Sequence, residues 1–133
     1  MNEFTLYFVE KNDKTIIWDF NGTKIKHCNY KKILKQVCEQ EITTLKARQE
    51  IVAKITNRHN NIPLYVNEKL IFFKIKDDDN IWINFFNVLW YESENNKTRV
   101  FFKNGSTILI NKKIKYLKEM AKLIKKITFY TQK

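Results

Sequence analysis

The chain of 133 residues contains very little glycine and proline, with two Gly and one Pro. This scarcity excludes collagen-like chains and disordered chains rich in these residues. Both glycines follow an asparagine, as Asn21-Gly22 and Asn104-Gly105, which is typical of tight hairpin turns rather than of a phosphate-binding loop. With 44% hydrophobic and 14% aromatic residues, the chain has enough apolar surface for one real core. We therefore expect a single domain over residues 1–133.

Groups that perform catalysis or bind metals are also scarce. Cys28 and Cys38 lack the paired spacing of a zinc site, and two histidines are too few to complete a four-ligand cage, so we expect buried, reduced thiols. Neither serine lies in a nucleophile elbow. The acidic run 77–79 lacks the alternating ligands, central Gly and distal Glu of a calcium loop, and it predicts a solvated turn. We expect no enzyme activity, no metal and no cofactor.

Long apolar runs are absent as well. No stretch approaches the length of a membrane-spanning helix, and the first residues do not form a basic start followed by an apolar segment. Both features predict a cytoplasmic protein with no membrane partner.

Acidic residues are few relative to basic ones. The chain has 25 Lys and Arg against 14 Asp and Glu, a formal net charge of +11 at pH 7. Self-repulsion of this size opposes compaction of a small domain and favours polyanionic partners. An A+T-rich genome explains why the basic residue is usually Lys, but it explains the shortage of acids less well. We interpret the excess as a polyanion-binding surface.

Alternating apolar segments with many aromatic residues are abundant, and they are typical of β-strands. The segments before residue 30 predict a three-stranded meander that turns at Asn21-Gly22. Those after residue 63 predict a second β group with a hairpin at Asn104-Gly105. The expected strands are residues 4–11, 15–20, 24–27, 64–66, 70–75, 81–84, 87–92, 98–103 and 106–110.

Two segments have apolar residues at helical spacing. Asn29 predicts the cap of a helix over residues 30–41, and residues 112–127 predict an amphipathic helix with lysines outside. Residues 42–56 fit either a helix or a turn into a strand over residues 50–56. The expected fold class is α+β. It comprises an antiparallel β-rich core of two hairpin or meander groups, one internal helix and a C-terminal amphipathic helix.

Three aromatic residues are candidates for stacking on nucleobases, namely Phe72, Trp82 and Tyr91. In a β-rich domain, Phe72 and Trp82 fit ordinary strand and core positions better, so we expect both in the core. Tyr91 fits an exposed position equally well.

Several short patterns together resemble the competence transcription factor (ComK) family. The most specific is Asn80-Ile81-Trp82-Ile83-Asn84, which is similar to the Trp-containing signature of that family. It is accompanied by a helix with an apolar pair and a Cys, a basic step, an Ile-Thr pair, a proline, a Phe-Phe step and a late strand with an Asn-Gly turn. These are Ile33-Leu34 to Cys38, Ala47-Arg48-Gln49, Ile55-Thr56, Pro63, Phe72-Phe73 and residues 100–105, and the resemblance covers roughly residues 24–125.

The chain also departs from the pattern that the resemblance supplies. Glu39-Gln40-Glu41 stands in place of an aromatic-Tyr-Gly run, and Ala47 in place of a Gly. Gln49 stands in place of a second basic residue, and Ile62 and Lys74 in place of two prolines. We interpret the chain as a divergent, short relative.

The resemblance implies a transcription activator that contacts A/T-rich double-stranded DNA from the minor groove and works as a homo-oligomer. The negative potential of a narrow A/T minor groove attracts arginine and lysine. Arg48 falls on the basic step and is the first choice for insertion, while a surface salt bridge with Glu41 or Glu50 is its alternative role. The candidate DNA-binding residues are Arg48, Lys46, Lys54, Arg58, Arg99, Lys118 and Lys122.

Three other functions fit the same sequence pattern. The strand-turn-strand-helix end resembles a different β-rich DNA-binding module, of the kind found in response regulators. A PH-like module, with two sheet layers closed by a C-terminal helix, uses basic loops to bind anionic lipid or a protein partner. The last alternative is a protein-only regulator that keeps the fold.

Overall fold

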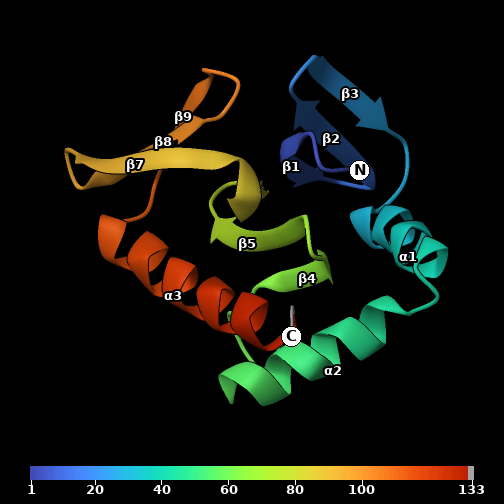
Figure 1. Ribbon diagram of the computed structural model, residues 1–133. Coiled ribbons are helices and arrows are strands. Elements are labelled where there is room, and N and C mark those ends of the chain that lie inside the picture. The colour runs from blue at the N-terminus through green and yellow to red at the C-terminus, as the bar shows by residue number, and fades with distance from the viewer. Residues whose placement is uncertain (132–133) are drawn as a thin grey trace.

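The computed structural model describes residues 1–131, so the last two residues of the predicted domain lie outside the described part. It contains a six-stranded antiparallel sheet, a three-stranded antiparallel sheet and three α-helices, which confirms the predicted α+β class (Figure 1). The elements are β1 Thr5–Lys11, β2 Lys14–Asp19, β3 Gly22–Lys26, α1 Tyr30–Gln40, α2 Leu45–Thr56, β4 Leu64–Asn67, β5 Leu70–Lys76, β6 Asn80–Asn84, a 3₁₀ turn Phe85–Asn87, β7 Val88–Glu94, β8 Lys97–Phe102, β9 Thr107–Ile110 and α3 Ile114–Thr131.

The large sheet joins the two predicted β groups into one layer. Its strand order is β3-β2-β1-β6-β5-β4, so the N-terminal meander continues directly into the strands that follow α2. β1 and β6 pair antiparallel with Phe8 opposite Trp82. Next to this junction, the side chains of Asn84 and Asn87 donate Nδ2 hydrogen bonds of 3.0 and 2.7 Å to the Thr5 carbonyl oxygen. These buried amides help fix the position of β1 beside β6.

Asparagine supplies most of the tight-turn conformations. Asn95 and Asn96 connect β7 to β8 with φ of 50° and 64°, which is the two-residue hairpin geometry that suits the twist of antiparallel strands. Asn12 has φ of 58° between β1 and β2. Side-chain amides tolerate this left-handed region better than most residues do, so short turns form here with very little glycine.

Residues 42–56, which the pattern left open, contain a second internal helix. Thr44 begins α2 because its Oγ1 accepts a hydrogen bond of 3.0 Å from the Ala47 amide. Asn57 ends α2 in the left-handed conformation, with φ of 53°. The predicted cap of α1 is confirmed, since Asn29 Oδ1 accepts a hydrogen bond of 2.8 Å from the Lys31 amide.

Two apolar clusters lie on opposite faces of the large sheet. One packs α1 against the sheet, and it contains Phe72 and Trp82, so both residues are in the core as expected. The other contains their strand neighbours Phe73 and Ile83 and packs against α3 and the small sheet. Tyr91 is half-buried beside this second cluster. The helix α2 lies at the β4 edge and contacts β4, α1 and α3 (Figure 1).

Candidate nucleic-acid interface

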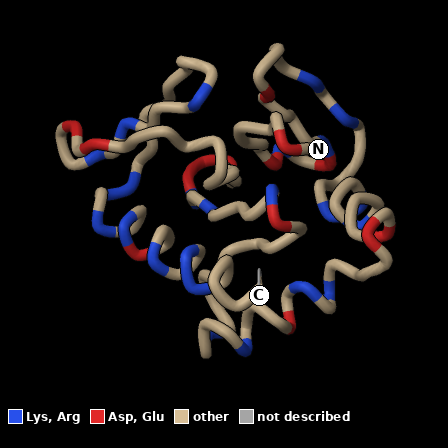
Figure 2. The backbone as a smooth tube through the Cα atoms, in the orientation of Figure 1, with Lys and Arg blue, Asp and Glu red and all other residues tan. Residues whose placement is uncertain are grey.

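The outer side of α3 carries a regular row of lysines, Lys115, Lys118, Lys122 and Lys125, which we call the α3 lysine stripe. All four are exposed, while the opposite face of the helix is buried in the core. Steps of three, four and three residues keep their side chains on one face, and ten residues at 1.5 Å each give a length of about 15 Å. Figure 2 shows basic residues recurring along this helix.

The single acidic residue within α3, Glu119, is paired with an arginine from outside the helix. Its Oε1 accepts a hydrogen bond of 2.9 Å from Arg58 Nη1, which comes from the loop after α2. Among residues 1–131, none of the stripe lysines forms an ion pair. The predicted residues Lys118 and Lys122 therefore lie together on a surface where the cations are available to a ligand.

Lys46 and Lys54 are also exposed, but on α2 and in a less favourable setting. Each lies four residues from the exposed Glu50, which stands between them on the same helix. A carboxylate at this spacing is a helix-surface neighbour of both ammonium groups. Glu119 stands at similar spacing from Lys115 and Lys122, but it is paired with Arg58, so Glu50 weakens the positive potential of its pair more than Glu119 weakens that of the stripe.

Arg48 is held inside the corner between α1, α2 and β4. Its Nη1 donates a hydrogen bond of 2.8 Å to Tyr65 Oη, and its Nη2 donates one of 3.3 Å to Glu41 Oε2. The guanidinium carbon lies 4.8 Å from the centre of the Tyr65 ring, and the side chain is 20% exposed. Of the two predicted roles, the pairing with Glu41 is present in this conformation. Insertion into a groove requires Arg48 to leave both partners.

Arg99 lies on strand β8 of the small sheet, between the buried residues Thr98 and Val100. Its Nε donates a hydrogen bond of 2.8 Å to Glu94 Oε2, and this bond lowers the pKa of the Glu94 carboxyl. The structure thus divides the seven predicted residues among α2, the following loop, α3 and β8. It brings Arg58 next to α3 through Glu119, and it does not bring Arg99 to the same surface.

From the lysine face of this helix, the candidate set took Lys118 and Lys122 and left out Lys115 and Lys125. Their heptad spacing with Lys118 and Lys122 was the available signal. Three exposed lysines on α1 form a second basic surface that was also left out of the candidate set, namely Lys31, Lys32 and Lys35.

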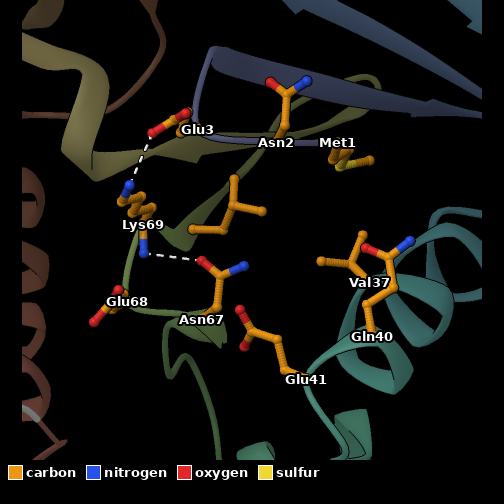
Figure 3. Close-up of a pocket in the computed structure, with 10 residues that line it drawn as sticks. Met1, Asn2, Glu3, Val37, Gln40, Glu41, Asn67, Glu68 and Lys69 are labelled. Carbon is orange, nitrogen blue, oxygen red and sulfur yellow. Dashed lines mark hydrogen bonds and ion pairs between the residues drawn. The ribbon is translucent and has the colours of Figure 1, made fainter.

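A hollow of about 300 Å³ beside the N-terminus has the wrong charge for a polyanion (Figure 3). Glu3, Glu41 and Glu68 line it together with Lys69, whose Nζ is paired with Glu3 Oε2 at 3.0 Å. The hydrogen bond from Lys69 to Glu3 raises the pKa of the lysine. This hollow does not belong to the candidate interface.

A metal-ligating cluster and a membrane-spanning helix are both absent from the described part of the chain. Residues 1–131 contain no group of three or more His, Cys, Asp or Glu side chains placed to hold a metal ion. In the same range, no helix combines the length and the apolar character needed to cross a membrane.

The fold and its surface define a small α+β protein whose helices present lysines to solvent that have no ion-pair partner among residues 1–131. The family model described as ComK protein matches residues 2–133, nearly the whole chain. The chain therefore belongs to the ComK family, a family of competence transcription factors. The match extends beyond residues 24–125, over which the sequence patterns carried the resemblance. No curated protein and no solved structure matches the chain.

Proposed function

We propose that this protein regulates transcription in the cytoplasm by binding A/T-rich double-stranded DNA. The α3 lysine stripe is the main phosphate-contacting surface, and Lys46 and Lys54 contribute less. The observation that carries this proposal is the row of exposed lysines whose only acidic neighbour within α3 is bonded to Arg58. Membership of a transcription factor family and the net charge of +11 support it.

Counterion release supplies the affinity in this mechanism. Each lysine that neutralises a phosphate releases condensed cations from the duplex, so binding weakens as salt rises. Neighbouring stripe lysines lie about 5–6 Å apart on the helix surface, which lets several engage one backbone at once. Such contacts orient the protein on the duplex but do not read its sequence.

The preference for A/T-rich sites is assigned to arginine in the minor groove. Arg48 remains the first candidate, and its insertion exchanges the bonds to Tyr65 and Glu41 for contacts with the groove. Arg58 and Arg99 are the other two arginines of the chain. Each of these is paired with a carboxylate in the structure, with Glu119 and Glu94 respectively.

Self-association completes the proposal, and the small sheet is the surface that supports it. Leu89, Trp90 and Leu109 are 67%, 61% and 41% exposed on strands β7 and β9. Exposed large apolar side chains of this kind are enriched in protein interfaces. This surface also carries the acidic residues Glu92 and Glu94. A second copy that binds here therefore does not place two lysine stripes against each other. Sedimentation of the Trp90→Glu variant tests this, because a charge at that position shifts an oligomer to monomer.

The decisive experiment measures duplex binding by fluorescence anisotropy over a range of salt concentrations. The K118Q/K122Q variant should reduce the slope of log K against log salt by about 0.9 for each lysine that contacts a phosphate. The control is K11Q/K14Q, which removes the same charge from the exposed β1–β2 hairpin. Equal losses in both variants refute the assignment to α3.

The same preparation separates DNA binding from the lipid-binding alternative. The proposal expects a salt-sensitive complex with duplexes, tighter for A/T-rich than for G/C-rich sequences at one salt concentration. Flotation with vesicles that contain anionic lipid, combined with no binding to any duplex, refutes DNA binding and favours a PH-like module.

A further inference from the structure

A cavity of about 350 Å³ that is partly open to solvent lies between α2, α3, the loop after α2 and the strands β5 and β6. It exists because the edge strand is short. β4 pairs with β5 from Asn67↔Leu70 only as far as Leu64↔Phe72, so the Lys74 end of β5 has no β4 neighbour. The two helices and the loop border that open edge, and Tyr116 Oη donates a hydrogen bond to the Lys74 carbonyl oxygen there. The volume lies at the small end of the range for metabolite sites, about 300–1,000 Å³.

Two of the lining residues carry buried polar atoms that have no hydrogen-bond partner in residues 1–131. They are the indole Nε1 of Trp82 and the amide Oε1 of Gln49. Trp82 is 8% exposed. Buried polar atoms are nearly always paired, and an exception calls for an explanation. The indole N–H is a donor and the amide oxygen is an acceptor, so together they can bind a ligand that has both an acceptor and a donor.

The charge of the cavity indicates the sign of a ligand. Its lining includes Lys74 and His59 and no carboxylate. Lys74 Nζ lies 5.5 Å from the centre of the Trp82 ring, and within residues 1–131 this ammonium forms no ion pair. A half-buried cation without a counter-charge in the lining favours a small anion.

We propose that this cavity binds a small carboxylate that also carries an amide or amine N–H group, such as an amino acid or an N-acyl amino acid. The carboxylate accepts from Lys74 Nζ and from Trp82 Nε1, and the N–H group donates to Gln49 Oε1, with small adjustments of the indole and of the Gln49 amide that bring their buried atoms to the cavity wall. This inference does not rest on the proposed DNA binding, because none of the four stripe lysines lines the cavity.

The test follows the indole N–H signals of the folded, ¹⁵N-labelled chain by NMR. The chain has three Trp, so it gives at most three such signals, and Trp82→Phe identifies that of Trp82. The probes are N-acetylglycine, N-acetylglutamate and glutamine, each raised to about 10 mM to cover weak affinities. We expect at least one probe to shift the Trp82 signal saturably. Acetate, which lacks the N–H, and acetamide, which lacks the carboxylate, should bind more weakly.

Two matched variants test the role of the cation. Lys74→Gln should weaken binding of the responding probe by about tenfold, because it removes the charge that the carboxylate meets. Lys76→Gln removes an exposed charge from the same strand outside the cavity, and it should leave the affinity unchanged. Equal weakening by both variants refutes the assigned contact. If no probe shifts the Trp82 signal saturably, the cavity holds ordered water only and the proposal is wrong.

Discussion

The two helices α2 and α3 both carry basic residues that the sequence marked as binding candidates, but they hold them in different ways. On α3, Lys118 and Lys122 point into solvent without an ion pair in the described part of the chain. On α2, Arg48 donates to Tyr65 and Glu41 and is largely covered. The difference teaches that the partners of a basic side chain decide how much it contributes to the surface potential. The sequence pattern in which the residue stands does not show those partners.

The largest expected effect is on DNA affinity when the whole α3 lysine stripe is neutralised. The K115Q/K118Q/K122Q/K125Q variant should lose at least about 100-fold in duplex affinity at low salt, with a salt slope reduced by up to about 3.6. Its stability should change little, because all four side chains are exposed. Anisotropy titrations and urea unfolding measure the two quantities. An unchanged salt slope would show that the α3 lysines do not contact phosphates, and it would contradict the proposal that α3 contributes more than α2.

The next effect in size is on stability when Arg48 is truncated. Arg48→Ala should lower the free energy of unfolding by about 1–3 kcal/mol, because Tyr65 Oη loses its donor and the α1–α2 corner loses its link. Arg48→Lys keeps the charge without the planar fork, so its loss should be smaller. Lys118→Ala is the control and should stay within about 0.5 kcal/mol of the parent. Urea unfolding curves distinguish the three.

Whether Arg48 enters the minor groove is tested with the Arg48 variants that remain folded. If Arg48 inserts, Arg48→Ala should flatten the preference for A/T-rich over G/C-rich duplexes at one fixed salt concentration. Arg48→Lys should retain part of that preference. An unchanged preference in Arg48→Ala would limit this residue to its structural contacts and move the test to Arg58 and Arg99.

A smaller effect is expected when the acidic residue beside the stripe is neutralised. Glu119→Gln should raise duplex affinity by about threefold, since a negative charge next to the phosphates is removed. Arg58→Ala should lower the affinity, because it leaves Glu119 without its cation. Glu68→Gln, in the hollow of Figure 3, makes the same change in net charge as Glu119→Gln and should have less effect. Equal gains from the two glutamate variants would show that only net charge matters.

The smallest effect is expected from the lysines of α2. The K46Q/K54Q variant should reduce the salt slope by only about a fifth as much as K118Q/K122Q, since Glu50 already offsets part of the charge near both residues. The two variants remove the same number of charges, so any difference between them reports on location. A larger reduction from K46Q/K54Q would move the centre of the interface from α3 to α2.

Local features of the fold were predictable because their causes are local. The hairpin turn at Asn104-Gly105 and the cap at Asn29 depend on residues within a few positions of each other. The turn expected at Asn21-Gly22 is also present, but it is shifted by one residue, with Phe20 and Asn21 in the loop and Gly22 already in β3. The stretch 42–56 was not decided in this way, because its apolar spacing fits both a helix and a strand. Its cap at Thr44 and its contacts with β4 and α3 show it as a helix.

The candidate site was predictable in its sign and only partly in its members. Net charge and the lysine face of the last helix pointed to Lys118 and Lys122, and both are exposed there. Arg48 was chosen from a family pattern, and no sequence pattern could show that its guanidinium donates a hydrogen bond to Tyr65. The cavity was not predicted either. Three of the positions at which the chain departs from that pattern line it, namely Gln49, Ile62 and Lys74.

By itself, the sequence determined the fold class, the turns, the faces of α1 and α3, and the excess of positive charge. These follow from periodicity, from short-range hydrogen bonds and from composition, all of which act over a few residues or over the chain as a whole. Only the tertiary structure decided that β1 pairs with β6, that Glu119 is bonded to Arg58, and that Gln49, Lys74 and Trp82 line one cavity. Each of these joins residues that are distant along the chain. The packing of the whole fold selects them, because local preference says nothing about which distant partner fits.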